Sequence, residues 1–211
     1  MQVIPSINAQ SFEEAKDFIK KASEFADWVH VDVGDGIFTP NVTWGNPADW
    51  SSIKGQLSNV KVEVHLMIES PDQVILPWFE AGANRVIVHV ESMEDADSLI
   101  QLGKNFNAEL GLAISPDTDI KELNVYFNKV NFYQILAVAP GKIGQEFKEP
   151  ILDKIKVLRV QAPDAIIEVD GGINPETARL VKEAGANIIV SAKYIWGATN
   201  PEKAFLDLSQ V

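Results

Sequence analysis

Short apolar runs with the pattern of buried strands alternate along the chain with longer segments of helical pattern. The segment 11–26, SFEEAKDFIKKASEFA, has apolar residues at the spacing of one helix face. Strand-like runs, MQVIPSI and ADWVHVDV, lie on either side of it. In total we predict eight strands, at 1–7, 26–33, 62–68, 85–90, 108–114, 130–138, 165–170 and 186–192.

Strict alternation of this kind predicts parallel strands joined by right-handed crossovers. Eight strands, with about as many helices, favour a closed (β/α)8 TIM barrel, an α/β fold, over an open doubly wound sheet. The sequence EAGAN occurs at 80–84 and again at 183–187. This repeat fits a common helix-to-strand loop as well as an ancestral duplication. No linker or change of composition interrupts the chain, so we predict one domain over 1–211.

The second predicted strand raises the question of chemistry, because its polar residues share one face. In VHVDV, His30 and Asp32 project opposite the valines, and on a strand buried on both faces they must line a site. Barrel active sites lie at the C-terminal strand ends, where His65, His89 and Asp170 are also expected. His30, Asp32, His65 and Asp170 therefore form a candidate site for one divalent metal ion: zinc, iron, manganese or cobalt. We interpret His89 as a packing or supporting residue.

Composition excludes several other classes of function. The net charge of −12 and pI near 4.6 argue against a nucleic-acid or anionic-membrane surface. With no cysteine, the chain has no disulfide, thiolate metal site or cysteine nucleophile, which is typical of a reducing cytoplasm. No run approaches membrane-spanning length and no signal-peptide pattern is present. We therefore expect a soluble cytoplasmic protein without nucleic-acid or membrane partners.

Glycine-rich turns follow the sixth and seventh predicted strands, PGKIGQEF at 140–147 and DGGINPET at 170–177. Glycines there let backbone N–H groups approach an anion, and a helix predicted from Pro175 adds its positive end. Barrels often bind phosphate near their last loops. Alone, each glycine pair is typical of any turn, but beside a metal site we interpret them as phosphate-binding.

These segments together resemble the ribulose-phosphate 3-epimerase family over nearly the whole chain. The matching segments follow the family's order: PSI, HVDVGDGIFTPN, VHLMIESPD, EAGAN with VHVES, GLAISPDT, PGKIGQEF and VDGGINPET. The resemblance implies a (β/α)8 barrel and an isomerase of the pentose phosphate pathway, which interconverts D-ribulose 5-phosphate and D-xylulose 5-phosphate at C3.

The resemblance also implies roles for individual residues. Asp32 and Asp170 would be the two acid/base groups and, with His30 and His65, the metal ligands. Ser6 matches the family's substrate-contacting serine. The substrate-binding residues implied are Ser6, His65, Met67, Gly141, Gly144, Gln145, Gly171, Gly172, Ala192 and Lys193.

Four departures from the family pattern concern the same region. Gly34 and Leu136 stand where the family has methionines, and Lys142-Ile143 alters the GFGGQ turn. The glycine-serine that receives phosphate after the eighth strand is here Ala192-Lys193. Lys193 either binds phosphate through its ammonium group or crowds the pocket and selects another substrate, and we favour phosphate binding.

Three other functions compete with the pentulose-phosphate epimerase. One is an epimerase of another ketose phosphate, such as D-allulose 6-phosphate. A second is aldol or decarboxylation chemistry on a related barrel, against which the pairing of Asp32 with Asp170 argues. A third is a non-catalytic relative that binds sugar phosphates, against which the four retained ligands argue. The sequence leaves the metal and a possible homo-oligomer open, and we interpret Trp78 as a packing residue rather than an interface.

Overall fold

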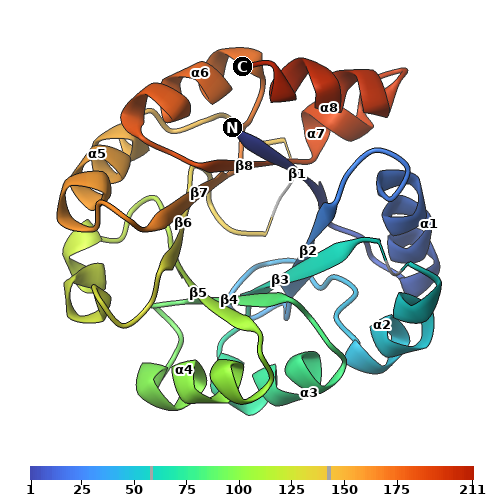
Figure 1. Cartoon of the computed structure of the whole chain (residues 1–211), viewed down its shortest axis with the longest axis horizontal. Coiled ribbons are helices and arrows are strands. Elements are labelled where there is room, and N and C mark those ends of the chain that lie inside the picture. Colours follow the sequence, from blue (N-terminus) through green and yellow to red (C-terminus); the bar gives the residue numbers. More distant parts are fainter. Residues whose placement is uncertain (58, 142–143) are drawn as a thin grey trace. The chain divides into compact units, whose positions relative to one another are not determined.

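A computed structural model describes residues 1–57, 59–141 and 144–211 of the chain. Its eight strands form a closed barrel in the order β1 to β8, which confirms the predicted TIM barrel (Figure 1). All eight predicted strands are present. They are β1 (Gln2–Ile7), β2 (Trp28–Gly34), β3 (Lys61–Met67), β4 (Arg85–His89), β5 (Glu109–Ile114), β6 (Phe132–Leu136), β7 (Ile166–Asp170) and β8 (Ile188–Ser191).

Helices follow the strands along the chain. The α-helices are α1 (Phe12–Ala22), α2 (Pro47–Ile53), α3 (Ile75–Glu80), α4 (Ala96–Asn105), α5 (Ile151–Gln161), α6 (Pro175–Ala184), α7 (Lys193–Trp196) and α8 (Pro201–Ser209). Short 3₁₀ helices are η1 (Lys54–Gln56), η2 (Pro71–Gln73) and η3 (Ile120–Tyr126). No helix among the described residues is long and apolar enough to cross a membrane.

The crossover between β5 and β6 differs from the expected α-helix. It holds only the 3₁₀ helix η3, in which Leu123 is the one buried residue. An α-helix in this position is stabilised mainly by packing an apolar face, and this segment has no such face to pack. The first turn of η3 is instead held by the Asp119 side chain, which accepts a hydrogen bond from the Lys121 backbone N–H.

The chain divides into two compact units, Ser6–Leu110 and Met1–Pro5 with Gly111–Val211. In the first unit, α1 to α4 lie outside strands β2 to β4, and in the second, α5 to α8 lie outside β6 to β8 (Figure 1). A single domain over 1–211 therefore stays a prediction.

Both faces of β2 are buried, as the site hypothesis requires. Val29, Val31 and Val33 are buried on one face, while His30 and Asp32, on the other, are 0% and 7% exposed. Since water does not solvate this polar face, its side chains must satisfy one another or bind a ligand.

Trp78 is a packing residue, as expected, because it is only 2% exposed. Its ring meets that of Trp44 edge-on at a centroid distance of 6.1 Å. It therefore contributes to the core of its unit.

Candidate metal centre and substrate site

The polar interior of unit Ser6–Leu110 is built from residues at paired positions on neighbouring strands. Ser6 pairs with His30, His30 with Glu63, and Asp32 with His65. Paired residues of parallel strands project to the same face, so these five side chains share one face of the sheet. His30 does not end its strand, as the sequence suggested, because β2 continues to Gly34. It lies one layer deeper than Asp32, which brings it level with Glu63.

Asp32 is the centre of this cluster. Its Oδ1 lies 3.2 Å from His30 Nε2 and 3.1 Å from His65 Nδ1. Its Oδ2 accepts a hydrogen bond of 2.8 Å from Ser6 Oγ. Ser6, His30, Asp32 and His65 are therefore together, as expected, and Met67 ends β3 opposite Gly34.

Hydrogen bonds and charges outweigh the effect of burial on the pKa of Asp32 and His30, but not on that of His65. Burial alone raises the pKa of Asp32, but hydrogen bonds and charge from His30 and His65 hold that pKa well below its usual range. Burial lowers the pKa of His30, yet Asp32 and Glu63 together raise it well above 6.5. Burial lowers the pKa of His65 to about 4, with the charges of His89 and His30 acting in the same direction. Asp32 is thus an anion facing one histidine that readily carries charge and one that does not.

A network of three charged side chains, Glu63, Arg85 and Glu109, lies on the Nδ1 side of His30. His30 Nδ1 lies 2.8 Å from Glu63 Oε1, and the other Glu63 oxygen accepts from the Arg85 guanidinium. Arg85 Nε donates to Glu109 at 2.8 Å. The side chains of Glu63 and Arg85 are 0% and 6% exposed. Because Glu63 is an acceptor, it fixes the Nδ1–H of His30 and turns Nε2 toward Asp32.

His65 is held by a different partner, the third histidine of the chain. His65 Nε2 lies 2.9 Å from His89 Nε2, and His89 Nδ1 lies 3.0 Å from Glu91 Oε2. Both ring nitrogens of His89 therefore have partners, and Phe38 packs on its ring at a centroid distance of 4.7 Å.

The donor set fits a divalent metal ion. A neutral imidazole has one N–H and one lone pair, so neutral His30, with its N–H on Glu63, directs a lone pair at Asp32 Oδ1. That arrangement needs a cation, either an added proton or a metal, between the two atoms. His30, Asp32 and His65 offer ligand atoms within 4.8 Å of one another. Imidazole nitrogens with a carboxylate suit zinc, iron, manganese and cobalt.

The remaining candidate residues belong to the other unit. Asp170 is the last residue of β7, and it is followed by two glycines with positive φ, Gly171 at +104° and Gly172 at +67°. A Cβ would lie 2.4 Å from the Val138 side chain at Gly171 and 2.9 Å from the Phe147 backbone at Gly172. The turn after Asp170 therefore requires glycine for both its conformation and its close packing.

Lys193 packs against the other glycine turn of this unit. Gly141 and Gly144 have φ values of +99° and +80°, and a Cβ at Gly144 would lie 3.1 Å from Lys193 Cδ. Gln145 Nε2 donates to the Ala139 carbonyl at 2.6 Å. Lys193 is exposed and follows Ala192, the residue before α7. The altered pair Lys142-Ile143 lies outside the described residues.

The start of α6 contributes less to anion binding than the sequence suggested. The Asn174 side chain accepts from the backbone N–H groups of Glu176 and Thr177, and Pro175 has no N–H. These first donors of the helix are therefore already used within the helix cap. A phosphate group in this unit would depend on the glycine turns and on Lys193.

Close packing of the following loop explains why glycine, and not methionine, occupies position 34. A Cβ there would lie 2.6 Å from the Asn41 carbonyl oxygen and 2.7 Å from Thr39 Oγ1. The loop after β2 thus closes against the backbone of Gly34, and a methionine would require a different loop conformation. Leu136 is buried at the end of β6, where it keeps an apolar surface.

Sequence reasoning gave no role to three residues that support the cluster: Glu63, Arg85 and Glu91. The role of Glu63 could have been predicted, since the strand alternation places it on the same face as His65. Arg85 begins a strand and follows a helix-to-strand loop, a position where a solvated charge is common. Glu91 follows β4, and only the fold shows that its side chain turns back to His89.

Comparison with known proteins shows the family to which the chain belongs. Residues 2–196 match the model of the ribulose-phosphate 3 epimerase family. The chain is 36% identical over 214 residues to a ribulose-phosphate 3-epimerase of Bacillus subtilis (strain 168), covering 99% of this chain and 98% of that protein. It is 34% identical to one from Mycobacterium leprae (strain TN), covering 96% and 91%. The structure of a 3-hexulose-6-phosphate synthase from Salmonella typhimurium superposes with a TM-score of 0.76 at 18% identity, covering 100% and 97% of the two chains, which shows the fold alone.

Proposed function

This chain belongs to the ribulose-phosphate 3-epimerase family and is a sugar-phosphate epimerase, and from that premise we propose that it interconverts D-ribulose 5-phosphate and D-xylulose 5-phosphate. The observation that carries the proposal is the cluster around Asp32, in which an ionised carboxylate is buried beside two histidines. Buried ionisable groups with strongly shifted pKa values are concentrated at functional sites, which supports this assignment.

We propose that His30, Asp32, His65 and Asp170 hold one divalent metal ion. The first three already present nitrogen and carboxylate ligand atoms to one another, and Asp170 ends a strand of the same closed barrel. When bound, the metal would supply positive charge that stabilises negative charge developing on the substrate oxygens. The metal's identity stays open among zinc, iron, manganese and cobalt.

The two aspartates would perform the proton transfers. Epimerisation removes the proton at C3, next to the ketone, from one face of the sugar and returns a proton to the other. Asp32 is kept ionised by His30 and His65, so it is in the deprotonated form that a proton acceptor requires. We propose that Asp170 performs the matching transfer on the opposite face. Ser6, which donates to Asp32 Oδ2, would orient that carboxylate beside the substrate.

The phosphate group of the substrate would lie at the glycine turns of the second unit. Gly144, Gly171 and Gly172 have no side chain that would block an approaching anion, and all three adopt positive φ. Lys193, whose side chain packs against Gly144, would supply the positive charge. This proposal gives the acidic protein a locally positive place for an anionic substrate.

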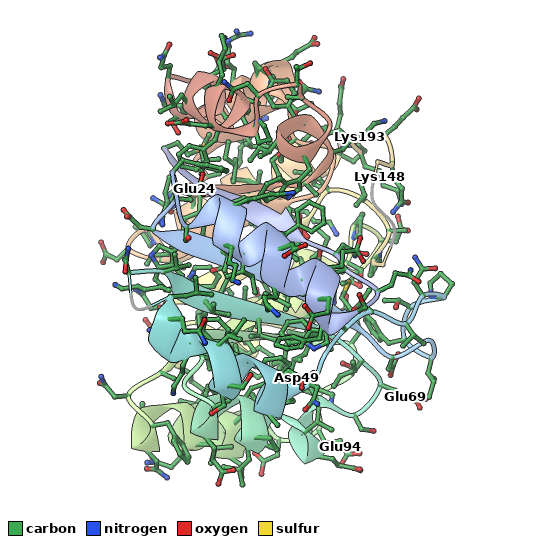
Figure 2. The ribbon with its side chains drawn as sticks, turned by 90° about the vertical axis from the view of Figure 1, so that its right-hand side faces the viewer. Glu24, Asp49, Glu69, Glu94, Lys148 and Lys193 are labelled. Atoms are coloured by element: carbon green, nitrogen blue, oxygen red, sulfur yellow. The ribbon has the colours of Figure 1, made fainter. Side chains whose placement is uncertain are left out.

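Replacing Lys193 by alanine is expected to raise KM for ribulose 5-phosphate by about 10- to 100-fold while kcat changes little. A charge-assisted hydrogen bond to phosphate contributes roughly 1.5–3 kcal/mol, and it is made equally in ground and transition states. Steady-state kinetics of the variant measure this effect. Lys148→Ala is the matched control, because Lys148 is drawn at the same end of this unit in Figure 2 but pairs with Asp117. Equal effects of the two substitutions would contradict the role of Lys193.

The proposed reaction is tested by proton NMR of the metal-loaded protein with ribulose 5-phosphate in deuterated water. Xylulose 5-phosphate should appear, with deuterium incorporated at C3. Exchange without that product, or no exchange from a protein shown to contain metal, would contradict the pentulose assignment. A parallel sample with D-allulose 6-phosphate tests the second candidate, an epimerase of a longer ketose phosphate. Turnover of the longer sugar alone would assign that substrate instead.

Location and assembly stay predictions. A relative from rice, 36% identical over 180 residues, is named a cytoplasmic isoform, which supports a cytoplasmic location. A homo-oligomer is compatible with the sequence.

A further inference from the structure

Three side chains of unit Ser6–Leu110, those of His65, His89 and Glu91, connect Asp32 to the solvent. His65 Nδ1 lies 3.1 Å from Asp32, His65 Nε2 lies 2.9 Å from His89 Nε2, and His89 Nδ1 lies 3.0 Å from Glu91. Both imidazoles are 0% exposed, while the Glu91 side chain is 22% exposed. This line of side chains therefore begins at the cluster and ends at a partly solvated carboxylate.

The positions of the protons along this line follow from the chemistry of its far end. A carboxylate only accepts hydrogen bonds, so Glu91 places the proton of a neutral His89 on Nδ1. His89 Nε2 then has a lone pair and accepts the N–H of His65 Nε2. His65 Nδ1 is then left with a lone pair, which replaces its hydrogen bond to Asp32 when a metal ion binds between the two groups.

The opposite arrangement would leave His65 unable to bind a metal. If His89 donated from Nε2, His65 would accept on its own Nε2 and carry its proton on Nδ1. That proton would face Asp32 and block the nitrogen nearest the cluster. The packing permits little ring rotation, because His89 lies between Phe38 at 4.7 Å and His65 at 5.1 Å, measured between ring centroids.

We propose that Glu91 is a positioning residue, which acts through His89 to keep the Nδ1 lone pair of His65 directed at the metal site. This inference rests on the proposed metal centre and adds to it a second support, independent of the Glu63–Arg85 pair behind His30. Neither Glu91 nor His89 touches the substrate or the metal in this proposal.

The test compares Glu91→Gln with Glu94→Gln. Both substitutions remove one negative charge, and Glu94 is an exposed residue three positions along the same loop, at the end of this unit that also carries Glu69 (Figure 2). A glutamine at 91 can donate as well as accept, so it no longer dictates the proton position on His89. Zinc dissociation constants from chelator competition and ¹⁵N NMR of the histidine rings are measured for each protein.

Glu91→Gln is expected to weaken zinc binding by about 10- to 100-fold, as loss of a supporting carboxylate does at other metal sites. In the zinc-loaded state its His89 should show a mixture of the two tautomers, while the zinc-loaded unaltered protein and Glu94→Gln show Nδ1–H on His89 and Nε2–H on His65. Equal zinc affinities and unchanged tautomers in Glu91→Gln would overturn this inference and leave the proposed function standing. Failure of the unaltered protein to bind zinc, cobalt, iron or manganese would overturn both.

Discussion

Replacing Asp170 by asparagine is expected to lower the rate of epimerisation by about 10²- to 10⁴-fold, because the amide cannot accept or return the C3 proton. The other aspartate should still act on its own face of the sugar. The variant should therefore exchange the C3 proton of one epimer with deuterated solvent without converting it. Proton NMR of each pure epimer in deuterated water measures both exchange and inversion.

The reciprocal substitution sharpens this experiment. Asp32→Asn should lower the rate of inversion by a similar factor, but exchange should now persist only with the other epimer. Metal content is measured for both variants, since Asp32 and Asp170 are also proposed ligands and an amide binds metal less strongly than a carboxylate. Appreciable inversion by either variant with metal bound would contradict the two-aspartate mechanism. Exchange of the same epimer by both would contradict their placement on opposite faces.

Replacing Arg85 by methionine is expected to lower the free energy of unfolding by about 3–5 kcal/mol, the range for breaking one side of a buried ion pair. The Arg85 guanidinium lies between Glu63 and Glu109 and stacks 4.6 Å from the centroid of the Trp28 ring. Methionine retains much of the volume but removes the guanidinium from the fully buried Glu63 carboxylate. Equilibrium unfolding in urea measures the change in the free energy of unfolding, provided that the m-value is the same for the variant and the unaltered protein.

Two variants separate this charge effect from lost packing. Glu109→Gln removes the outer partner, whose side chain is 35% exposed, and should cost about 1 kcal/mol or less. The double variant Arg85→Met with Glu63→Gln removes both buried charges and should recover part of the lost stability. A single Arg85→Met effect no larger than that of Glu109→Gln would refute the argument. No recovery in the double variant would assign the loss to packing with Trp28.

The sequence by itself determined the barrel and most of the inner face of its second strand. Eight apolar runs alternating with helical segments leave few topologies, because parallel strands need crossovers and a period of two fixes which residues share a face. His30 and Asp32 could be assigned to one face because three valines occupy the other. His65 followed from the same alternation on the third strand. These predictions rest on local geometry, which depends only on residue order.

Only the tertiary structure decided which side chains support those residues through hydrogen bonds and ion pairs. The partners of His30 and His65 come from other strands and loops, and the alternation within one strand does not specify which residues of a neighbouring strand or loop they meet. Arg85 is buried because Glu63 pairs with it across β3 and β4, although an arginine at a strand start is ordinarily solvated. The donors at the start of α6 were unavailable because the Asn174 cap used them. Sequence order places side chains on faces, but only long-range pairing determines which charges meet inside the protein and therefore which are stable there.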